Sequence, residues 1–211
     1  SDDRAIAEHE VGQADLIADR GCEALRNVER YQHAKERAFV DDITEAYNAR
    51  YLRSVLDQEV RRADRYGTCF SILFLDVDYF KRINDSYGHL IGSEILHRAS
   101  RLLLQCIRQV DTLARYGGDE FVILLSDTES AEAALVAERI RRTVDEFAFE
   151  MRRGGRLHLT FSIGVATFSE DGASRELLLE VADRAMYRAK FLGRNRVCVA
   201  AELGHGEVSG D

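Results

Sequence analysis

The chain has 211 residues and a formal net charge of −8, from 29 Lys and Arg against 37 Asp and Glu, and 45% of its residues are hydrophobic. This length predicts one globular domain with an appended segment, and the acidic balance argues against a nucleic-acid partner, which requires a basic face. No apolar stretch approaches the roughly 18 residues that cross a bilayer, so we expect a soluble, cytoplasmic domain. Four widely spaced cysteines, three of them in apolar runs, argue against disulfides and a zinc site.

Residues 1–40 predict a connecting helix. Apolar and small residues recur at alternating steps of three and four from Val11 to Phe39, which is the spacing of a coiled coil. Gly21, Gln32 and Lys35 interrupt this seam. A solvated connector and a dimerising signalling helix therefore remain equal alternatives.

From residue 41 onward, the pattern alternates between short strands and helices. In chain order it predicts a helix at 47–65, a strand at 69–77, a helix at 92–110, strands at 112–115 and 121–125, a helix at 131–147, a strand at 157–168 broken at Gly164, a helix at 175–192 and a strand at 196–199. After the first helix, this order is the split βαβ pattern of ferredoxin-like sheets, with helices on one face. We expect an α+β domain at 41–201, with a mixed, mainly antiparallel sheet, and a disordered tail at 202–211.

Two acidic groups follow the ends of predicted strands. Asp76–Asp78 closes the central apolar strand, and Asp119-Glu120 follows Gly117-Gly118, a glycine pair suited to the positive φ angles of a hairpin turn. Taken separately, each group fits a plain loop or turn. In a ferredoxin-like sheet, however, the strand and the hairpin are neighbours, so these carboxylates would converge. Converging carboxylates require a cation, and hard oxygen ligands favour Mg²⁺.

The residues around these groups resemble the GGDEF family, whose members make cyclic dinucleotides. The signature is Arg115-Tyr116-Gly117-Gly118-Asp119-Glu120-Phe121. Further blocks in family order are Asp42-Ile43-Thr44, Leu75 to Lys81, Ile83-Asn84-Asp85, Gly88-His89, Thr160 to Ala166, and Ala189-Lys190 with Gly193-Arg194-Asn195. The resemblance covers residues 41–200 and implies a palm-type nucleotidyl cyclase. Glu45 and Ala46 depart from the usual Gly and Leu, a change that is either neutral or tunes substrate choice.

The resemblance also assigns roles to particular residues. The catalytic and metal-binding group would be Asp76, Val77 through its carbonyl, Asp119 and Glu120, holding two Mg²⁺ or Mn²⁺ ions for phosphoryl transfer. Contacts to phosphate and ribose would come from Phe80, Lys81, Gly117, Gly118, Lys190 and Arg194. Lys190 and Arg194 are expected one helical turn apart, and the alternative is that they only complement the helix dipole.

Partners follow from the same resemblance. Each domain would bind one nucleotide, so the active unit is expected to be a homodimer with the site at the subunit interface. An upstream sensory domain is expected in the full-length bacterial protein, which is either cytoplasmic or tethered to the membrane. Arg108 and Asp111 match the family's inhibitory site for the cyclic dinucleotide product. A surface ion pair at a helix end is the alternative for this pair.

Asn84 and Ser93 occupy the positions that read the base, where most family members have Asn and Asp. A carboxylate accepts both donors of guanine N1 and N2 but repels the bare N1 of adenine, whereas a hydroxyl donates and accepts. The serine at this position also resembles a subgroup of GGDEF enzymes, described as hybrid and promiscuous, that join GTP to ATP. We therefore expect cyclic GMP-AMP from GTP and ATP, with cyclic di-GMP and cyclic di-AMP as side products. Ser93 could also act as a helix N-cap, a role compatible with base reading.

Two alternatives to this function remain. The first is a conventional diguanylate cyclase that makes only cyclic di-GMP. The second is a silent module that binds nucleotide without turnover. The intact Asp76, Asp119 and Glu120 favour turnover, because silent modules commonly lose the acidic pair of the signature.

Overall fold

The computed structural model describes residues 39–150 and 155–203. The coiled-coil prediction for residues 1–40 therefore lies outside the described residues, apart from Phe39 and Val40, as does the tail beyond Leu203. Ala200–Leu203 form a short 3-10 helix, so the first two residues of the tail predicted at 202–211 are helical. Within the described ranges, no helix is long and apolar enough to span a membrane.

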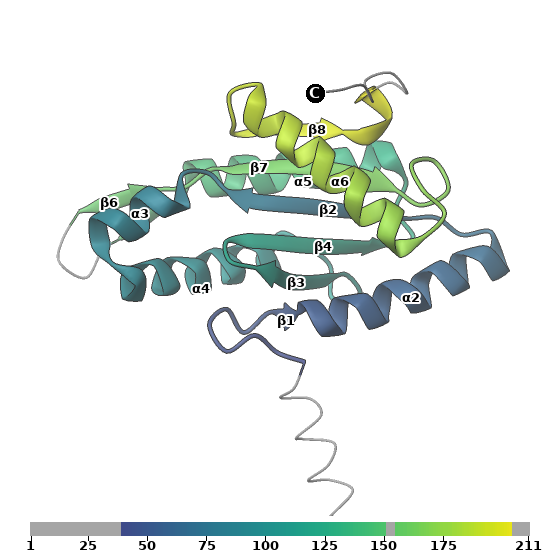
Figure 1. The fold of residues 1–211 in the computed structure, drawn as a ribbon, viewed down its shortest axis with the longest axis horizontal. Coiled ribbons are helices and arrows are strands. Elements are labelled where there is room, and N and C mark those ends of the chain that lie inside the picture. Colours follow the sequence, from purple (N-terminus) through teal and green to yellow (C-terminus); the bar gives the residue numbers. More distant parts are fainter. Residues whose placement is uncertain (1–38, 151–154, 204–211) are drawn as a thin grey trace, which may run out of the picture. The chain divides into compact units, whose positions relative to one another are not determined.

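A six-stranded sheet forms the centre of the fold (Figure 1), with the strand order β1-β3-β4-β2-β7-β8. Its strands are β1 (Tyr47–Asn48), β2 (Phe70–Val77), β3 (Thr112–Gly117), β4 (Glu120–Ser126), β7 (Phe161–Thr167) and β8 (Arg196–Val199). β2 pairs antiparallel with both β4 and β7, while β1 and β8 add parallel edge pairs. The predicted α+β, ferredoxin-like sheet is confirmed.

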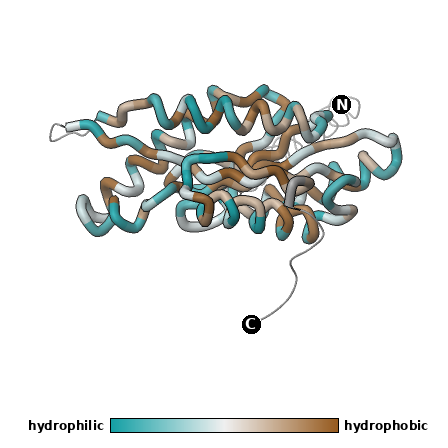
Figure 2. Tube along the Cα trace, turned by 90° about the horizontal axis from the view of Figure 1, so that it is seen from above, coloured by the Kyte–Doolittle hydropathy of each residue, from teal (hydrophilic) through white to brown (hydrophobic). Residues whose placement is uncertain are grey.

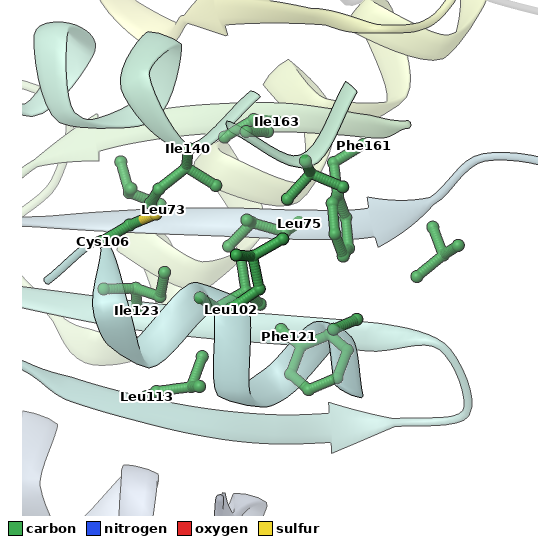
Figure 3. Close-up of a cluster of buried hydrophobic side chains, with 14 of the residues drawn as sticks. Leu73, Leu75, Leu102, Cys106, Leu113, Phe121, Ile123, Ile140, Phe161 and Ile163 are labelled. Carbon is green, nitrogen blue, oxygen red and sulfur yellow. The ribbon is translucent and has the colours of Figure 1, made fainter. Parts of the chain in front are cut away.

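Helices cover both faces of this sheet, not one face as predicted. α2 (Ala49–Tyr66) and α6 (Arg175–Phe191) pack on the side of Ile72 and Phe74, and α4 (His89–Gln105) and α5 (Ser130–Glu146) pack on the side of Leu73 and Leu75 (Figure 3). Figure 2 shows hydrophobic residues gathered between these layers. Helices cover both faces because β2 is apolar at consecutive positions, a pattern typical of strands buried on both faces.

The segment between β2 and β3 differs from the prediction of one helix at 92–110. A short helix, α3 (Phe80–Tyr87), precedes α4, and Gly88 with a φ of 83° separates the two. Because α4 already begins at His89, Ser93 lies in its second turn and not at an N-cap. Helix capping therefore does not explain the serine.

Gly164 does not break the strand predicted at 157–168. The interruption lies earlier, because β6 (Arg156–His158) pairs with β5 (Ala148–Glu150) in a separate two-stranded sheet, and β7 runs unbroken through Gly164. A Cβ at Gly164 would lie 2.0 Å from the Ala182 carbonyl oxygen and 2.4 Å from the Met186 nitrogen. The glycine thus allows the backbone of α6 to lie directly on the sheet.

Gly164→Ala is expected to lower the free energy of unfolding by about 1–3 kcal/mol, the usual cost of overpacking a core. Gly117→Ala is the matched control, since it adds the same methyl group where no atom lies within 4 Å and φ is not positive. Its effect is expected to stay within about 0.5 kcal/mol. Urea unfolding of both variants measures the difference, and equal effects would contradict the packing role of Gly164.

Candidate functional site

The end of β2 and the β3–β4 hairpin bring the predicted acidic residues together. Asp76 lies opposite Glu120 in the antiparallel register, and the Val77 amide donates to the Asp119 carbonyl at 3.3 Å. Asp76 follows Ile72 and Phe74 on the sheet face that α6 covers. Like charges placed directly opposite in a sheet are destabilising. The site therefore favours a bound cation.

Burial strengthens this preference for a cation. Asp76 is only 7% exposed, and burial raises the pKa of its carboxyl to about 6, with Lys190 opposing the shift and the charge of Asp119 adding to it. Burial also raises the pKa of Glu120, to which the charges of Asp76 and Asp183 contribute. These carboxylates repel one another in a partly dry environment, which a positive ion would relieve.

Lys190, in the last turn of α6, supplies a cation to this group. Its Nζ lies 2.7 Å from Asp76 Oδ2. Lys190, which was predicted to contact phosphate, therefore forms an ion pair with Asp76, which was predicted to bind metal. Arg194 lies beyond the helix with a φ of 62°, and its guanidinium stacks over the Tyr79 ring at 4.6 Å from the centroid. The predicted spacing of one helical turn was therefore wrong, because α6 ends at Phe191, three residues before Arg194.

Asp78 has a structural role in this region. Its carboxylate accepts hydrogen bonds from Ser162 Oγ and Thr160 Oγ1, both at 2.7 Å, and from the Asn195 amide at 3.0 Å. These bonds join the end of β2 to β7 and to the segment after α6. Asp78 therefore fixes the place of the C-terminal end of α6, which carries Lys190, and both of its oxygens are engaged.

The hairpin turn is held by Arg115, the first residue of the signature, to which the sequence assigned no role of its own. Arg115 donates to the Gly118 carbonyl through Nε at 2.9 Å and also forms an ion pair with Asp41 at 3.1 Å. Of the two glycines, only Gly118 has a positive φ, at 52°, so the expectation that both supply such angles was half right. Gly117 has no packing or backbone need to be glycine, which leaves its face open to a ligand.

The predicted phosphate contacts Phe80 and Lys81 lie at the N-terminal end of α3. Phe80 is buried and Lys81 is exposed. The preceding residue, Tyr79, has a φ of 59° and provides no side-chain cap to the helix. Amide groups at an uncapped helix N-terminus are suited to phosphate oxygens.

Asn84 and Ser93, the predicted base readers, lie on the adjoining helices α3 and α4. A Cβ at Gly92 would lie 2.0 Å from Asn84 Oδ1, so the Asn84 amide lies directly against the residue before Ser93. Both Asn84 and Ser93 are half-buried. The absence of a side chain at Gly92 thus makes room for Asn84, a requirement that the sequence alone did not reveal.

Arg108 and Asp111 do not form the ion pair considered as an alternative. Asp111 Oδ2 accepts from the Arg108 backbone amide at 2.8 Å, while Asp111 Oδ1 is buried without a hydrogen-bond partner among the described residues. The Arg108 side chain is exposed and forms no ion pair with the described part of the chain. The guanidinium remains available to an anionic ligand.

The donor set at the acidic group fits a divalent metal ion. The carboxylates of Asp76, Asp119 and Glu120 and the Val77 carbonyl are hard oxygen ligands, the type that Mg²⁺ and Mn²⁺ prefer. The ammonium on Asp76 shows that this position accepts a cation. In residues 39–150 and 155–203, no three His, Cys, Asp or Glu side chains are already gathered as a metal site.

A mixed sheet with acidic side chains on its central strand and on the neighbouring hairpin defines a palm-like domain of the nucleotidyl cyclase type. Residues 38–196 match the family model described as "Diguanylate cyclase, GGDEF domain". The chain belongs to the GGDEF domain family. Diguanylate cyclases of this family use divalent metal ions in general.

Similar proteins include two curated relatives of greater length. The chain is 41% identical over 179 residues to the response regulator PleD of Caulobacter vibrioides, covering 84% of this chain and 39% of PleD. It is 41% identical over 158 residues to diguanylate cyclase DosC of Escherichia coli K12, covering 75% of this chain and 34% of DosC. The chain therefore spans between a third and two fifths of these relatives.

Solved structures agree with the fold. The coiled coil and GGDEF domain of DgcB from Caulobacter crescentus, in complex with c-di-GMP, has a TM-score of 0.82 at 28% identity and covers 87% of this chain and 96% of that chain. The GGDEF domain of PA1120 from Pseudomonas aeruginosa has a TM-score of 0.72 at 30% identity, covering 74% of this chain and 97% of that one.

Proposed function

We propose that the chain condenses two purine nucleoside triphosphates into a 3′,3′-cyclic dinucleotide and pyrophosphate. The observation that carries the proposal is the buried Asp76 carboxylate, opposite Glu120 and beside Asp119, with Lys190 within reach. Such a group suits a metal-bound triphosphate. Family membership and relatives named diguanylate cyclases support the same reaction.

Two equivalent bond exchanges make the product. In each, the 3′-oxygen of one nucleotide bonds to the α-phosphorus of the other, the bond from that phosphorus to the bridging oxygen breaks, and pyrophosphate leaves. The proposed ligands for two Mg²⁺ or Mn²⁺ ions are Asp76, Asp119 and the Val77 carbonyl, and bound ions would neutralise the triphosphate and acidify the hydroxyl. Glu120, whose pKa burial raises, is the proposed acceptor of the hydroxyl proton.

The triphosphate is assigned to the cations and amides around this group. Lys190 and Arg194 would bind its outer phosphates, together with the backbone amides at Phe80 and Lys81. Gly117 and Gly118 leave the hairpin open, so the ribose can approach the backbone. Asn84 and Ser93 would then face the base.

A single site supplies only half of the geometry. The cyclic dinucleotide contains two nucleotides and each domain is proposed to bind one, so the proposed active unit is a homodimer that places two nucleotides antiparallel across a twofold axis. The chain spans only part of its relatives, and residues 1–40 are assigned to the connection with an upstream sensory domain. Product bound at Arg108 and Asp111 is the proposed feedback.

The identity of the product is the finer part of the proposal. The names of the relatives favour the conventional reading, in which GTP alone gives cyclic di-GMP. Ser93 favours a second candidate, cyclic GMP-AMP from GTP and ATP, because a hydroxyl lacks the repulsion that a carboxylate exerts on adenine N1. Ser93 follows Gly92, which packs against Asn84, and lies away from the N-cap of α4, which supports a contact with the base.

Incubation with equal GTP and ATP in the presence of Mg²⁺, followed by chromatography, tests both the synthesis of a cyclic dinucleotide and the identity of the product. We expect a cyclic dinucleotide containing guanine, and product per subunit should fall on dilution because the dimer dissociates. A mixed product would select cyclic GMP-AMP, and cyclic di-GMP alone would select the conventional cyclase. No pyrophosphate with either nucleotide would reject turnover and leave a nucleotide-binding module.

A further inference from the structure

The ion pair between Lys190 and Asp76 bears on how the site is assembled. The Lys190 ammonium lies 2.7 Å from Asp76 Oδ2, with the Asp76 side chain 10% and the Lys190 side chain 26% exposed. Water therefore screens this pair less than it screens a surface pair. A metal ion bound at Asp76 would lie close to this ammonium, and the repulsion between the two cations weakens metal binding while Lys190 remains bonded to Asp76.

The position of Lys190 is built into the fold. The backbone of α6 lies on Gly164, so the helix is held close to the sheet. The carboxylate of Asp78 accepts from the Asn195 amide and so ties the segment after α6 to the end of β2. Ala189, the neighbour of Lys190, is fully buried. Contacts before and after Lys190 in the sequence thus hold this residue next to Asp76.

We propose that Lys190 is a stand-in cation that blocks divalent metal from Asp76 until a nucleoside triphosphate is bound. The inference rests on the proposed function, because it takes the triphosphate as the anion that draws Lys190 away. On arrival of the triphosphate, the ammonium exchanges Asp76 Oδ2 for a phosphate oxygen, and Asp76 is freed for the metal. No covalent bond changes in this step.

The exchange makes metal and nucleotide binding cooperative. Each ligand favours the arrangement in which Lys190 has left Asp76, so each raises the affinity of the other by the same factor. The full set of metal-binding carboxylates would then be available only when substrate is bound. Metal alone would bind weakly.

Calorimetric titration with Mn²⁺ in the absence of nucleotide tests the proposal on the whole 211-residue chain. Lys190→Met removes the cation and is expected to tighten Mn²⁺ binding about tenfold or more, the effect of losing a charge-assisted hydrogen bond. Arg188→Met is the matched control, since Arg188 is an exposed cation of the same helical turn. It removes the same charge and is expected to change Mn²⁺ affinity less than about twofold, as for a screened surface charge.

Three further measurements sharpen the test. Lys190→Arg keeps a cation and should retain weak Mn²⁺ binding. Adding Asp76→Asn to Lys190→Met should abolish the gain, which locates the metal. A non-hydrolysable GTP analogue should raise Mn²⁺ affinity in the wild type and much less in Lys190→Met. Thermal unfolding of each variant identifies any that fail to fold.

Equal Mn²⁺ affinity in Lys190→Met and Arg188→Met would overturn the inference, as would a gain that survives the Asp76→Asn substitution. Failure of the proposed function has a different signature. In that case Lys190→Met would still bind Mn²⁺ more tightly, but the wild type would release no pyrophosphate from GTP or ATP.

Discussion

Replacing Asp76 with Asn is expected to reduce product formation by about 1000-fold or more, because Asp76 is a proposed metal ligand and the charge neutralisation that a metal ion provides is worth several kcal/mol in the transition state. Asn keeps the volume of the side chain and can still accept a hydrogen bond from Lys190, so the fold should persist. Pyrophosphate release with GTP and ATP under Mg²⁺ is the measurement. Asp64→Asn, which neutralises an exposed carboxylate on α2, is the control and should retain activity.

The same substitution is expected to stabilise the metal-free protein. Since the pKa of Asp76 is raised from 3.8 to about 6, the folded state holds this proton more tightly than the unfolded chain. Ionisation therefore costs stability, a loss that develops as the pH rises through about 4 to 6 and is complete above that range. Asp76→Asn should remove this part of the pH dependence and raise the free energy of unfolding at pH 7 by about 1–3 kcal/mol.

Urea unfolding in the presence of EDTA, at pH values from 4 to 8, compares Asp76→Asn with Asp64→Asn. A steeper loss of stability between pH 4 and 6 in the control than in Asp76→Asn is the expected result. Parallel curves would contradict the burial cost assigned to Asp76. Lost activity together with gained stability would mark Asp76 as a residue kept for function at the expense of the fold.

The position of the acidic group could be predicted from sequence because it depends on local patterns. The apolar run before Asp76 specifies a buried strand, and the glycines before Asp119 specify a turn, so the two acidic groups fall at neighbouring strand ends. The continuous apolar character of β2 also contained the information that helices cover both faces.

Other features depend on contacts between distant residues and have no local signal. The fit of Asn84 against Gly92 and that of α6 against Gly164 require knowledge of how close two backbones lie. A glycine inside a strand reads equally well as a break, a bulge or a close contact. The bond between Lys190 and Asp76 joins residues 114 positions apart, so no spacing rule could assign it.

Ser93→Asp is expected to raise the preference for GTP over ATP by about 10- to 100-fold, as the ratio of the two kcat/KM values. The carboxylate would accept both donors on the guanine N1 and N2 edge and would face the bare N1 of adenine with like polarity. Position 93 lies in the second turn of α4, next to Gly92, which packs against Asn84, and no capping bond is lost. Product chromatography with equal GTP and ATP gives an independent measure of the same preference.

Ser86→Asp is the matched control, because it makes the same chemical change at an exposed position of α3. It should leave the GTP to ATP ratio unchanged within about twofold, since an exposed charge is screened by solvent. An equal shift in both variants would mean that added negative charge, and not base recognition, sets the preference. No shift in Ser93→Asp would mean that the base is read elsewhere, and the case for cyclic GMP-AMP would lose its one residue-level support.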